Sequence, residues 1–528
     1  MKIRRSAGVL AAAVALSTLL AACGGGGATP SSASGQGGKT LVIDTAFQLK
    51  TTDPARMFEP TGLLIDQSIY DTLLTFKGGD VTKPVPALAE SYTAAPDAKS
   101  FTFKLRTDAK FSDGTPVTSA DVVFSLNRVK NVKGNPSFLM DGLTVTAPDP
   151  ATVVVASEKP NTAVPFILPN PALGIVNSAV AKKNGASDAE GADKADTAES
   201  FFNAQSLGSG PYVLDSYSTT SQVVLTVNEK YWGPKPAYAK VVVRNTQANV
   251  QRLNVLKGES QIAVDLSPEQ AKGLDQLQIV NGASPNVFFV FTNNNPEISK
   301  ISSNPKFQEA VRYGIDYQSL VDLAGEGAVQ APGVVPSVFL GALPAGDGVK
   351  RDVARAKAAL AESGLQNPTV KLNYPSDVQV NGLNFGDLAA RVQANLKEVG
   401  INVELAPASV QTALESYRGG TEEMGLWQWG PDFPDPSNYL NFLPGQLVGL
   451  RAGWAEGAAP ELEELGAKAG TTVEDSERSG LYVDIQHKMN EAGPIMPLIQ
   501  PAQILVAAKS VSNLQSNALW LVNVRELG

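Results

Sequence analysis

From Thr40 onward the chain alternates short β-branched or aromatic runs with longer amphipathic stretches, and this alternation most limits what the chain can fold into. Residues 41–43 and 101–106 have the pattern of strands, and residues 63–74 place apolar side chains at helical spacing. Strands that alternate with helices pack as a sheet covered by helices. We therefore expect an α/β protein, and we find no fixed-period repeat that would indicate a solenoid or a propeller.

The same patterns predict further elements. Further strands are predicted at residues 223–227, 240–244, 262–265, 288–291, 370–374 and 401–405, and further helices at residues 249–256, 307–315, 320–324, 353–361 and 388–399. Thr118 followed by Asp121 has the spacing of a capping box, which predicts a helix that begins there. Residues 184–200 are rich in Ala, Asp and Gly, a composition that indicates a surface loop or an exposed helix.

Charge and composition exclude several classes of function. The chain has 43 basic and 52 acidic residues, and its net charge of -9 argues against a general nucleic-acid binder. Its single cysteine, Cys23, and its single histidine, His487, exclude an intrachain disulfide, a Cys/His zinc site and a two-histidine metal site. We expect no cofactor and no bound metal, and we expect His487 to lie exposed on a helix.

The N-terminus has the layout of a secretory signal peptide. Three basic residues precede a mostly apolar stretch that ends at Ala22 and is shorter than the roughly 20 residues a membrane-spanning helix needs. The sequence Leu20-Ala21-Ala22-Cys23 resembles the bacterial lipobox, in which cleavage leaves an acylated cysteine as the first residue. We predict a signal peptide at 1–22, then lipidated Cys23 and a flexible tether over 23–39. The alternative is an ordinary secretory signal with an incidental cysteine.

A series of short motifs is ordered along the rest of the chain. The longest is Pro86-Ala87-Leu88-Ala89-Glu90-Ser91-Tyr92, followed by residues 101–106 and by residues 111–124, which begin Phe111-Ser112-Asp113-Gly114-Thr115-Pro116. The others are Thr52-Asp53-Pro54-Ala55, Ile69-Tyr70-Asp71-Thr72-Leu73-Leu74, Gly208-Ser209-Gly210-Pro211-Tyr212, Ala310-Val311-Arg312-Tyr313-Gly314-Ile315-Asp316 and Asp432-Phe433-Pro434-Asp435-Pro436. Together they resemble the bacterial extracellular solute-binding proteins of family 5, the dipeptide-, oligopeptide- and nickel-binding subunits of ABC importers.

This resemblance implies a two-lobed periplasmic-binding-protein-like α/β fold (type II, cluster C) with an extra domain on the first lobe. By analogy, lobe 1 combines residues 40–75, 205–285 and 501–528, the added domain spans 76–204, and lobe 2 spans 286–500. A solute that contacts both lobes favours the closed state.

The resemblance also implies partners and a location. The expected role is that of a lipoprotein that delivers a peptide or another amine-bearing solute to ABC permease and ATPase subunits. We expect a monomer on the outer face of the bacterial cytoplasmic membrane, anchored to the membrane through Cys23 and without a nucleic-acid partner.

Asp432 is the first candidate ligand residue. In peptide-binding relatives, an aspartate in the segment that matches residues 427–433 binds the α-ammonium group of the ligand. A carboxylate in a closed cleft makes a charge-assisted hydrogen bond with an ammonium group. The alternative is that Asp432 and Asp435 only begin turns before proline.

Aromatic residues suggest further contacts. Trp427 and Trp429 lie two positions apart, so they share one face of a strand and could form either a ligand platform or a packed core. Phe58 and Glu59 follow the Asp53-Pro54 turn, in a loop that approaches the cleft in relatives, although simple surface placement is the alternative.

The sequence differs from the dipeptide-binding relatives at a position that contacts the carboxylate of the ligand. Dipeptide-binding relatives present an arginine to it just before the helix that matches residues 388–399, and this chain has Gln379 there. The departure therefore argues against a short peptide whose carboxylate is clamped in that way, and it leaves open a longer peptide or another cationic or amine-bearing solute.

Two other functions stay open. One is a secreted carboxylate-dependent hydrolase such as a glycosidase, although no two carboxylates stand in a recognisable catalytic setting and His487 is the only histidine available for a triad. The other is a surface sensor or adhesin that keeps the fold without transport. We expect a binding protein and not an enzyme.

Overall fold

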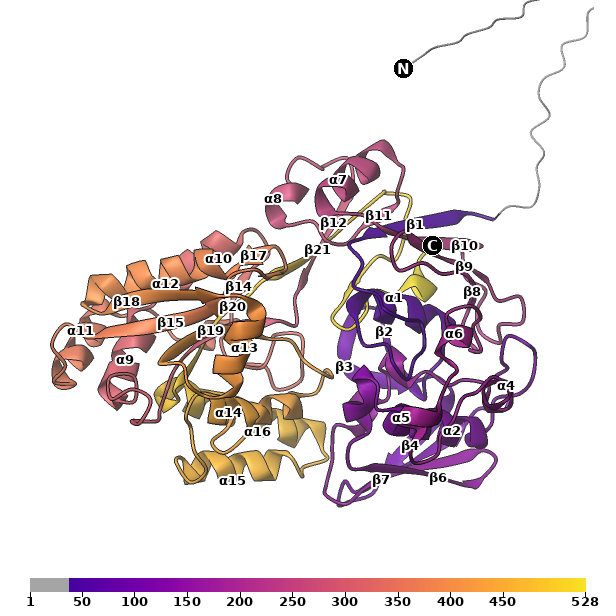
Figure 1. Cartoon of the computed structure of the whole chain (residues 1–528), viewed down its shortest axis with the longest axis horizontal. Coiled ribbons are helices and arrows are strands. Elements are labelled where there is room, and N and C mark those ends of the chain that lie inside the picture. The colour runs from indigo at the N-terminus through magenta and orange to yellow at the C-terminus, as the bar shows by residue number, and fades with distance from the viewer. Residues whose placement is uncertain (1–37) are drawn as a thin grey trace, which may run out of the picture. The chain divides into compact units, whose positions relative to one another are not determined.

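A computed structural model of the chain describes residues 38–528 (Figure 1). The predicted signal peptide, Cys23 and most of the predicted tether therefore lie outside the described residues. Within residues 38–528, no helix is both long and apolar enough to cross a membrane. Strands and helices alternate along the described chain, so the α/β expectation is confirmed.

The first large sheet has seven strands in the order β12-β21-β11-β1-β10-β9-β8. The strands are β1 (Thr40–Thr45), β8 (Tyr212–Ser216), β9 (Gln222–Val227), β10 (Lys240–Asn245), β11 (Ile262–Ala263), β12 (Gln278–Ala283) and β21 (Ala502–Ala507). β1 runs parallel to β10 and β11, whereas the other neighbours are antiparallel. Leu41 and Ile43 of β1 are fully buried, as the two-residue period of a strand predicts.

The second large sheet has six strands in the order β14-β20-β13-β19-β15-β18. The strands are β13 (Val287–Thr292), β14 (Val329–Gln330), β15 (Thr369–Pro375), β18 (Asn402–Ala408), β19 (Met424–Trp429) and β20 (Ile495–Gln500). All six residues of β13 are buried, because this central strand is covered on both faces. Its continuous apolar run, in place of an alternating pattern, follows from that position.

The helices beside this sheet are amphipathic. They include α9 (Pro305–Gly314), α10 (Tyr317–Ala324), α11 (Val353–Glu362), α12 (Phe385–Val399) and α13 (Val410–Arg418). α12 begins where the Asn384 side chain accepts a hydrogen bond from Gly386 N (2.7 Å), and it ends at Gly400, whose φ of 96° suits glycine. Its buried face contacts β15 and β18 (Figure 1).

A smaller antiparallel sheet has the order β4-β5-β7-β6, with β4 (Ala89–Ala94), β5 (Ser100–Leu105), β6 (Leu143–Asp149) and β7 (Thr152–Ser157). Helix α2 (Ser119–Val132) packs against it and ends just before the 3₁₀ helix η1 (Asn135–Met140). Thr118 donates to Asp121 Oδ2 from its backbone N (3.0 Å) and from Oγ1 (2.7 Å). The helix predicted to begin at Thr118 is therefore confirmed.

The chain passes between the two large sheets twice, from β12 to β13 and from β20 to β21. The two crossings are hydrogen-bonded to each other. Ser284 N donates to Pro501 O (3.1 Å), and Gln500 Nε2 donates to Ser284 O (2.5 Å). Ser284 and Gln500 are almost completely buried, so the paired crossings are packed inside the protein.

Two regions differ from their sequence patterns. The helix expected over residues 63–74 is α1 (Pro60–Ile69), and Leu74 begins strand β2 (Leu74–Lys77). α1 stops at Ile69, because the carbonyl oxygen of Ile69 accepts a hydrogen bond from Gly210 N (3.0 Å) in place of a further helical N–H. Gly208 and Gly210 lie so close to this oxygen that a Cβ atom on either glycine would be only 2.1 or 2.6 Å from it. In residues 184–200, expected on the surface, Asp196 is 7% exposed, because it forms an ion pair with buried Arg128.

The remaining elements complete the chain. The strands are β3 (Asp80–Pro86), β16 (Gln379–Val380), β17 (Leu383–Asn384), β22 (Ser516–Asn517) and β23 (Leu521–Val522). The helices are α3 (Val164–Ile167), α4 (Ser178–Lys183), α5 (Ala192–Ala195), α6 (Glu199–Phe202), α7 (Ala248–Lys257), α8 (Pro268–Ala271), α14 (Leu447–Arg451), α15 (Pro460–Ala469) and α16 (Asp475–Ala492). The 3₁₀ helices η2 (Pro171–Leu173), η3 (Ala345–Asp347), η4 (Pro436–Phe442) and η5 (Val524–Glu526) are short.

Candidate ligand-binding site

A pocket of about 550 Å³ lies beside the C-terminal end of β19. It is lined by Phe138, Pro375, Val378, Val380, Phe385, Val410, Leu414, Tyr417, Arg418, Trp427, Gln428, Trp429, Gly430, Asp432, Leu447 and Arg451. Most of these side chains are aromatic or aliphatic. Asp432 is the one acid among the lining residues, and Arg418 and Arg451 are the two cations. An apolar pocket with a few charged groups is the usual form of a small-molecule site.

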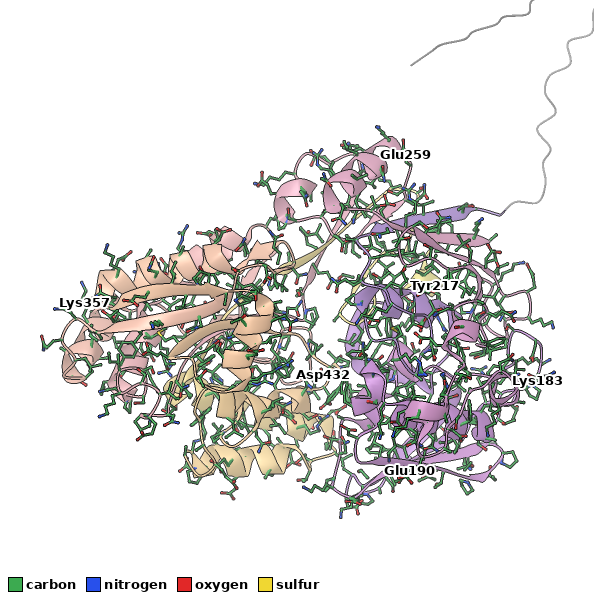
Figure 2. All side chains as sticks on the ribbon, in the orientation of Figure 1. Lys183, Glu190, Tyr217, Glu259, Lys357 and Asp432 are labelled. Carbon is green, nitrogen blue, oxygen red and sulfur yellow. The ribbon has the colours of Figure 1, made fainter. Side chains whose placement is uncertain are left out.

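Asp432 lies in the segment that follows β19 and is partly buried (Figure 2). Its Oδ2 accepts a hydrogen bond from Asn438 Nδ2 (3.0 Å). Burial raises the pKa of the Asp432 carboxyl, and the hydrogen bond from Asn438 lowers that pKa in part. Within residues 38–528, no lysine, arginine or histidine lies within ion-pair distance of Asp432. The carboxylate can therefore accept a cationic group from a ligand.

Trp429 lines the same pocket and is tied to the same amide. Its Nε1 donates to Asn438 Oδ1 (2.8 Å), and its ring lies edge-on to Phe442 at 5.6 Å between centroids. Asn438 and Phe442 belong to η4. The Asn438 amide thus fixes the indole with its oxygen and the carboxylate of Asp432 with its nitrogen.

Trp427 both packs in the core and lines the pocket. It is 5% exposed, and its ring stacks on Tyr417 with 4.3 Å between centroids and 17° between planes. Its Nε1 donates to Glu422 Oε2 (2.8 Å). The core packing considered from the sequence is present, and contact of Trp427 with a ligand stays a prediction.

Glu422 is a buried acid behind the pocket wall. It is 1% exposed, and it accepts from Ser416 Oγ (2.7 Å) as well as from Trp427. Burial raises the pKa of Glu422 to about 7, and the two hydrogen bonds oppose that rise.

Asp435 has a structural role. It is completely buried and accepts from the Arg478 guanidinium (2.7 and 2.8 Å) and from Ser437 N (2.9 Å), where it caps η4. These bonds use both of its carboxylate oxygens, and Asp435 does not line the pocket. Of the two aspartates in the Asp-Phe-Pro-Asp-Pro motif, Asp432 is the one on the pocket wall.

Phe58 and Glu59 lie behind the part of the pocket wall that Phe138 forms. The rings of Phe58 and Phe138 meet edge-on at 5.1 Å, and Asn135 Nδ2 donates to Glu59 Oε1 (3.2 Å). Gly134 allows this approach, because a Cβ atom there would lie 2.3 Å from Ala55 O. Phe58 and Glu59 do not line the pocket themselves, but they contact the segment that carries Phe138.

Gln379 lies outside the pocket wall. It is exposed on β16, while its neighbours Val378 and Val380 line the pocket, as the alternation of a strand requires. The turn of this hairpin reaches the crossing between the sheets, where Asn381 Oδ1 accepts from Ser284 Oγ and Asn286 Nδ2 (both 3.0 Å).

Sequence reasoning did not identify Phe138, Tyr417, Arg418, Arg451 or Asn438 as site residues. They come from η1, α13, α14 and η4, which are far apart in the chain. Each has an ordinary local pattern, so no motif indicates that they converge. An arginine at the end of α13 and another at the end of α14 are equally compatible with exposed helix ends.

Several of the ordered motifs stabilise the fold instead. Asp71 forms an ion pair with Arg525 and accepts from Ser209 Oγ (2.8 Å) and Trp232 Nε1 (3.0 Å). Asn177 Nδ2 donates to Asp113 Oδ2 (3.0 Å). These contacts join segments that are far apart in the sequence, so the motifs mark the architecture of the protein.

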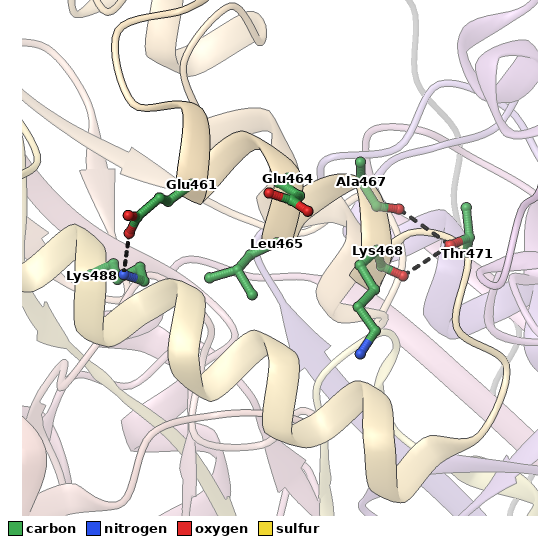
Figure 3. Close-up of a pocket in the computed structure, with 7 residues that line it drawn as sticks. All are labelled: Glu461, Glu464, Leu465, Ala467, Lys468, Thr471 and Lys488. Carbon is green, nitrogen blue, oxygen red and sulfur yellow. Dashed lines mark hydrogen bonds and ion pairs between the residues drawn. The ribbon is translucent and has the colours of Figure 1, made fainter.

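A second pocket, between α15 and α16, has a different character (Figure 3). Its charged side chains are exposed, and Lys488 Nζ pairs with Glu461 Oε2 at 3.0 Å. Thr471 Oγ1 donates to the carbonyl oxygens of Ala467 (3.3 Å) and Lys468 (3.0 Å). None of the candidate residues lines this surface pocket.

His487 lies on α16 with its side chain 43% exposed, and its Nε2 is 3.5 Å from Asp347 Oδ2. Among the described residues, no three His, Cys, Asp or Glu side chains are grouped to hold a metal ion.

Comparison with known proteins connects this architecture with a family. The profile of the bacterial extracellular solute-binding proteins, family 5 Middle, matches residues 83–447. The probable D,D-dipeptide-binding periplasmic protein DdpA of Escherichia coli strain K12 is 30% identical over 492 residues, which cover 91% of this chain and 92% of that protein.

Solved structures share the fold. HbpA2 from Haemophilus parasuis matches with a TM-score of 0.82 at 22% identity, over 93% of this chain and 99% of that one. DppA from Helicobacter pylori in complex with the peptide STSA matches with a TM-score of 0.70 at 22% identity, over 93% of this chain and 98% of that one. The expected two-lobed periplasmic-binding-protein-like fold is confirmed. Because the family profile spans more than half of the sequence, the chain belongs to the bacterial extracellular solute-binding proteins of family 5.

Proposed function

We propose that this protein captures a short peptide, or another solute with a free amine, and delivers it to the permease of an ABC importer. The observation that carries the proposal is Asp432, a partly buried carboxylate on an aromatic pocket wall with an amide neighbour and no described cation beside it. An ammonium group in the pocket would supply the missing charge through a charge-assisted hydrogen bond. The relatives named for D,D-dipeptides and for peptide STSA support a peptide as the solute.

Lobe closure is the proposed capture mechanism. We propose lobe 1 at 40–75, 205–285 and 501–528, an added domain at 76–204, and lobe 2 at 286–500. Phe138, in the proposed added domain, lines the pocket together with residues of lobe 2, so a ligand there would contact both parts. The paired crossings at Ser284 and Pro501 supply few connections to bend, as hinge closure requires.

Anchoring and location follow from the N-terminus. The proposal includes cleavage before Cys23, acylation of its thiol and retention of a monomer on the outer face of the cytoplasmic membrane. Replacement Cys23→Ser should release the protein from the membrane fraction without a lipid. Retention of the variant in that fraction would count against the anchor and leave the solute proposal unaffected.

A binding role suits the pocket better than hydrolysis. A glycosidase needs two carboxylates that flank the scissile bond, and Asp432 is the one acid among the lining residues. A sensor that binds the same solute would use the same pocket. Strains that lack the protein would distinguish transport from sensing, because loss of transport abolishes uptake of a radiolabelled peptide.

The test of solute class is calorimetry on the mature protein with pools of tripeptides. Pools with a free amino terminus should bind, whereas N-acetylated pools should bind about 10- to 100-fold more weakly, because the charged hydrogen bond to Asp432 is lost. Asp432→Asn should bring both pools to similar affinity. Asp484→Asn is the matched control, since Asp484 is exposed on α16 and outside the pocket.

Two results would contradict the proposal. One is full affinity of Asp432→Asn for free-amine peptides. The other is failure of every peptide pool to bind while the protein hydrolyses a polymer, which would favour the enzyme.

A further inference from the structure

We infer that Arg451, with Arg418 beside it, binds the terminal carboxylate of the ligand, so that the pocket selects zwitterionic peptides with both ends free. This inference rests on the proposed function and adds the second end of the ligand. It starts from the two cations on the pocket wall, which come from the last residues of α14 and α13.

Arg451 is positioned by an aromatic ring and not by an acid. Its guanidinium carbon lies 4.6 Å from the centroid of Tyr417, a cation–π arrangement. Arg451 is half-buried, and no carboxylate in residues 38–528 lies within ion-pair distance of it. The guanidinium is thus held over the ring of Tyr417, and its N–H donors have no acid partner among the described residues.

Arg418 belongs to the same wall. It is exposed at the end of α13, and it too has no ion-pair partner within the described residues. The ends of α13 and α14 lie against each other. Gly420 follows α13, and a Cβ atom on Gly420 would lie 3.3 Å from Leu450 O in α14. Two unpaired guanidinium groups in one pocket create a positive region that favours an anion.

Other arginines of the chain show the contrast. Arg128, Arg478 and Arg525 each pair with a buried aspartate, and Arg351 and Arg355 pair with glutamates. These arginines stabilise the fold through internal acids. Arg451 and Arg418 differ because they line a cavity and have no such acid among the described residues.

The anionic and cationic groups line one pocket together with Tyr417, Trp427 and Trp429. Arg451 contacts Tyr417, and Tyr417 stacks on Trp427. Trp429 lies two residues further along β19, about 6.6 Å along a strand, and its partner Asn438 binds Asp432. Asp432 and Arg451 therefore line one pocket, and among the described residues they do not pair with each other.

A pocket that carries both an acid and unpaired arginines suits a short peptide. Each residue of an extended chain spans at most about 3.3–3.6 Å, so a peptide of a few residues could place its ammonium group at Asp432 and its carboxylate at Arg451. Its side chains would then contact the rings and the aliphatic wall. Arginine suits the carboxylate because its fork of N–H groups makes two parallel hydrogen bonds.

The experiment compares three tripeptide pools by calorimetry on the mature protein: free at both ends, amidated at the C-terminus, and acetylated at the N-terminus. For the unmodified protein, amidation should weaken binding by about 10- to 100-fold. In Arg451→Gln the affinity for the free pool should fall by the same factor. The affinity for the amidated pool should equal that of the unmodified protein. Arg418→Gln should show a smaller loss with the same dependence on amidation.

Controls separate this role from a structural one. Arg391→Gln removes the same charge from an exposed position on α12 and should leave all three affinities unchanged. Arg451→Lys keeps the charge without the fork and should recover part of the affinity for the free pool. The comparison of peptide ends on the unmodified protein needs no variant, so a folding defect in Arg451→Gln would not affect it.

The outcomes distinguish this inference from the proposed function. Equal affinity of the unmodified protein for free and amidated pools would overturn the carboxylate site and leave the ammonium site at Asp432 intact. If Arg451→Gln lost the same amount of affinity for the free and the amidated pools, the carboxylate site would also be overturned, because that result indicates a structural role for Arg451. Failure of all three pools to bind would overturn the proposed function and this inference together.

Discussion

Asn438 donates a hydrogen bond from Nδ2 to Asp432 Oδ2 over 3.0 Å, so an amide, and not a cation, orients the one carboxylate among the described residues that line the pocket. The same amide accepts from Trp429 through its oxygen. An amide can orient a carboxylate without neutralising it. The arrangement therefore keeps the negative charge of Asp432 available to a ligand.

We expect Asn438→Ala to weaken the binding of free-amine tripeptides by about 10-fold, since both Asp432 and Trp429 lose a partially buried hydrogen bond. Calorimetry measures the affinity, and tryptophan fluorescence should report the release of the indole. Asn441→Ala is the control, because the one side-chain hydrogen bond of Asn441 among the described residues goes to the Asn438 carbonyl oxygen and not to Asp432 or Trp429. Unchanged affinity and fluorescence in Asn438→Ala would show that the amide does not orient the site.

Binding should depend on pH through Asp432. Burial raises the pKa of this carboxyl, so it becomes neutral at a higher pH than an exposed aspartate, whose pKa is about 3.9. Affinity for free-amine peptides should therefore be greatest at neutral pH and should decline as the pH falls through the raised pKa. Calorimetry from pH 8 to pH 4, in steps of about one unit, measures the decline. Asp432→Asn should remove it, and an equal decline in that variant would assign it to another group.

Phe138→Ala should reduce peptide affinity by about 2- to 10-fold, the usual contribution of one aromatic contact. Phe138 lines the pocket from η1 and is 36% exposed. Tyr92→Ala is a matched control, since Tyr92 is also 36% exposed but stacks on Phe103 away from this pocket. Equal effects of the two substitutions on calorimetric affinity would indicate that Phe138 does not contact the ligand.

Stability should depend on pH through Glu422. Its pKa of about 7 in the folded protein exceeds the value of about 4.3 in an unfolded chain, so the folded state binds the proton more tightly. The stabilisation is fully present below about pH 4 and is lost as the pH rises to about 7, with a total of up to about 4 kcal/mol.

Glu422→Gln should remove that decline while it keeps an acceptor for Trp427 Nε1. Urea unfolding over the same pH range measures the difference, and the exposed Glu415→Gln is the control. The same decline in Glu422→Gln as in the unmodified protein would contradict the assignment.

Arg128→Met should destabilise the protein by about 3–5 kcal/mol, because Asp53 and Asp196 lose their bidentate cation and keep only the longer contacts to Arg56, at 3.8 and 3.2 Å. Arg128 bonds Asp53 at 2.5 and 2.7 Å and Asp196 at 2.7 and 3.0 Å, and all three residues are at most 7% exposed. Lys488→Met breaks an exposed pair and should cost at most about 1 kcal/mol. Urea unfolding compares the two variants, and similar losses would show that the buried pairs contribute no more than the exposed one.

Most secondary structure could be predicted from local patterns. The alternation at Leu41 and Ile43 identifies a half-buried strand, and Thr118 with Asp121 identifies a helix start, because strand periodicity and capping are local properties of the backbone. The end of α1 could not be predicted in this way. Gly208 and Gly210 set it from more than a hundred residues further along the chain.

Some residues of the candidate site could likewise be indicated from the sequence, and others could not. The sequence alone placed Trp427 and Trp429 on one strand face, and the family resemblance indicated Asp432, because these residues are neighbours in the chain. Only the tertiary structure brought Phe138, Asn438 and Arg451 to them and left Gln379 outside the wall. Such convergence depends on packing between distant elements, and a local pattern carries no information about which distant side chain will face it.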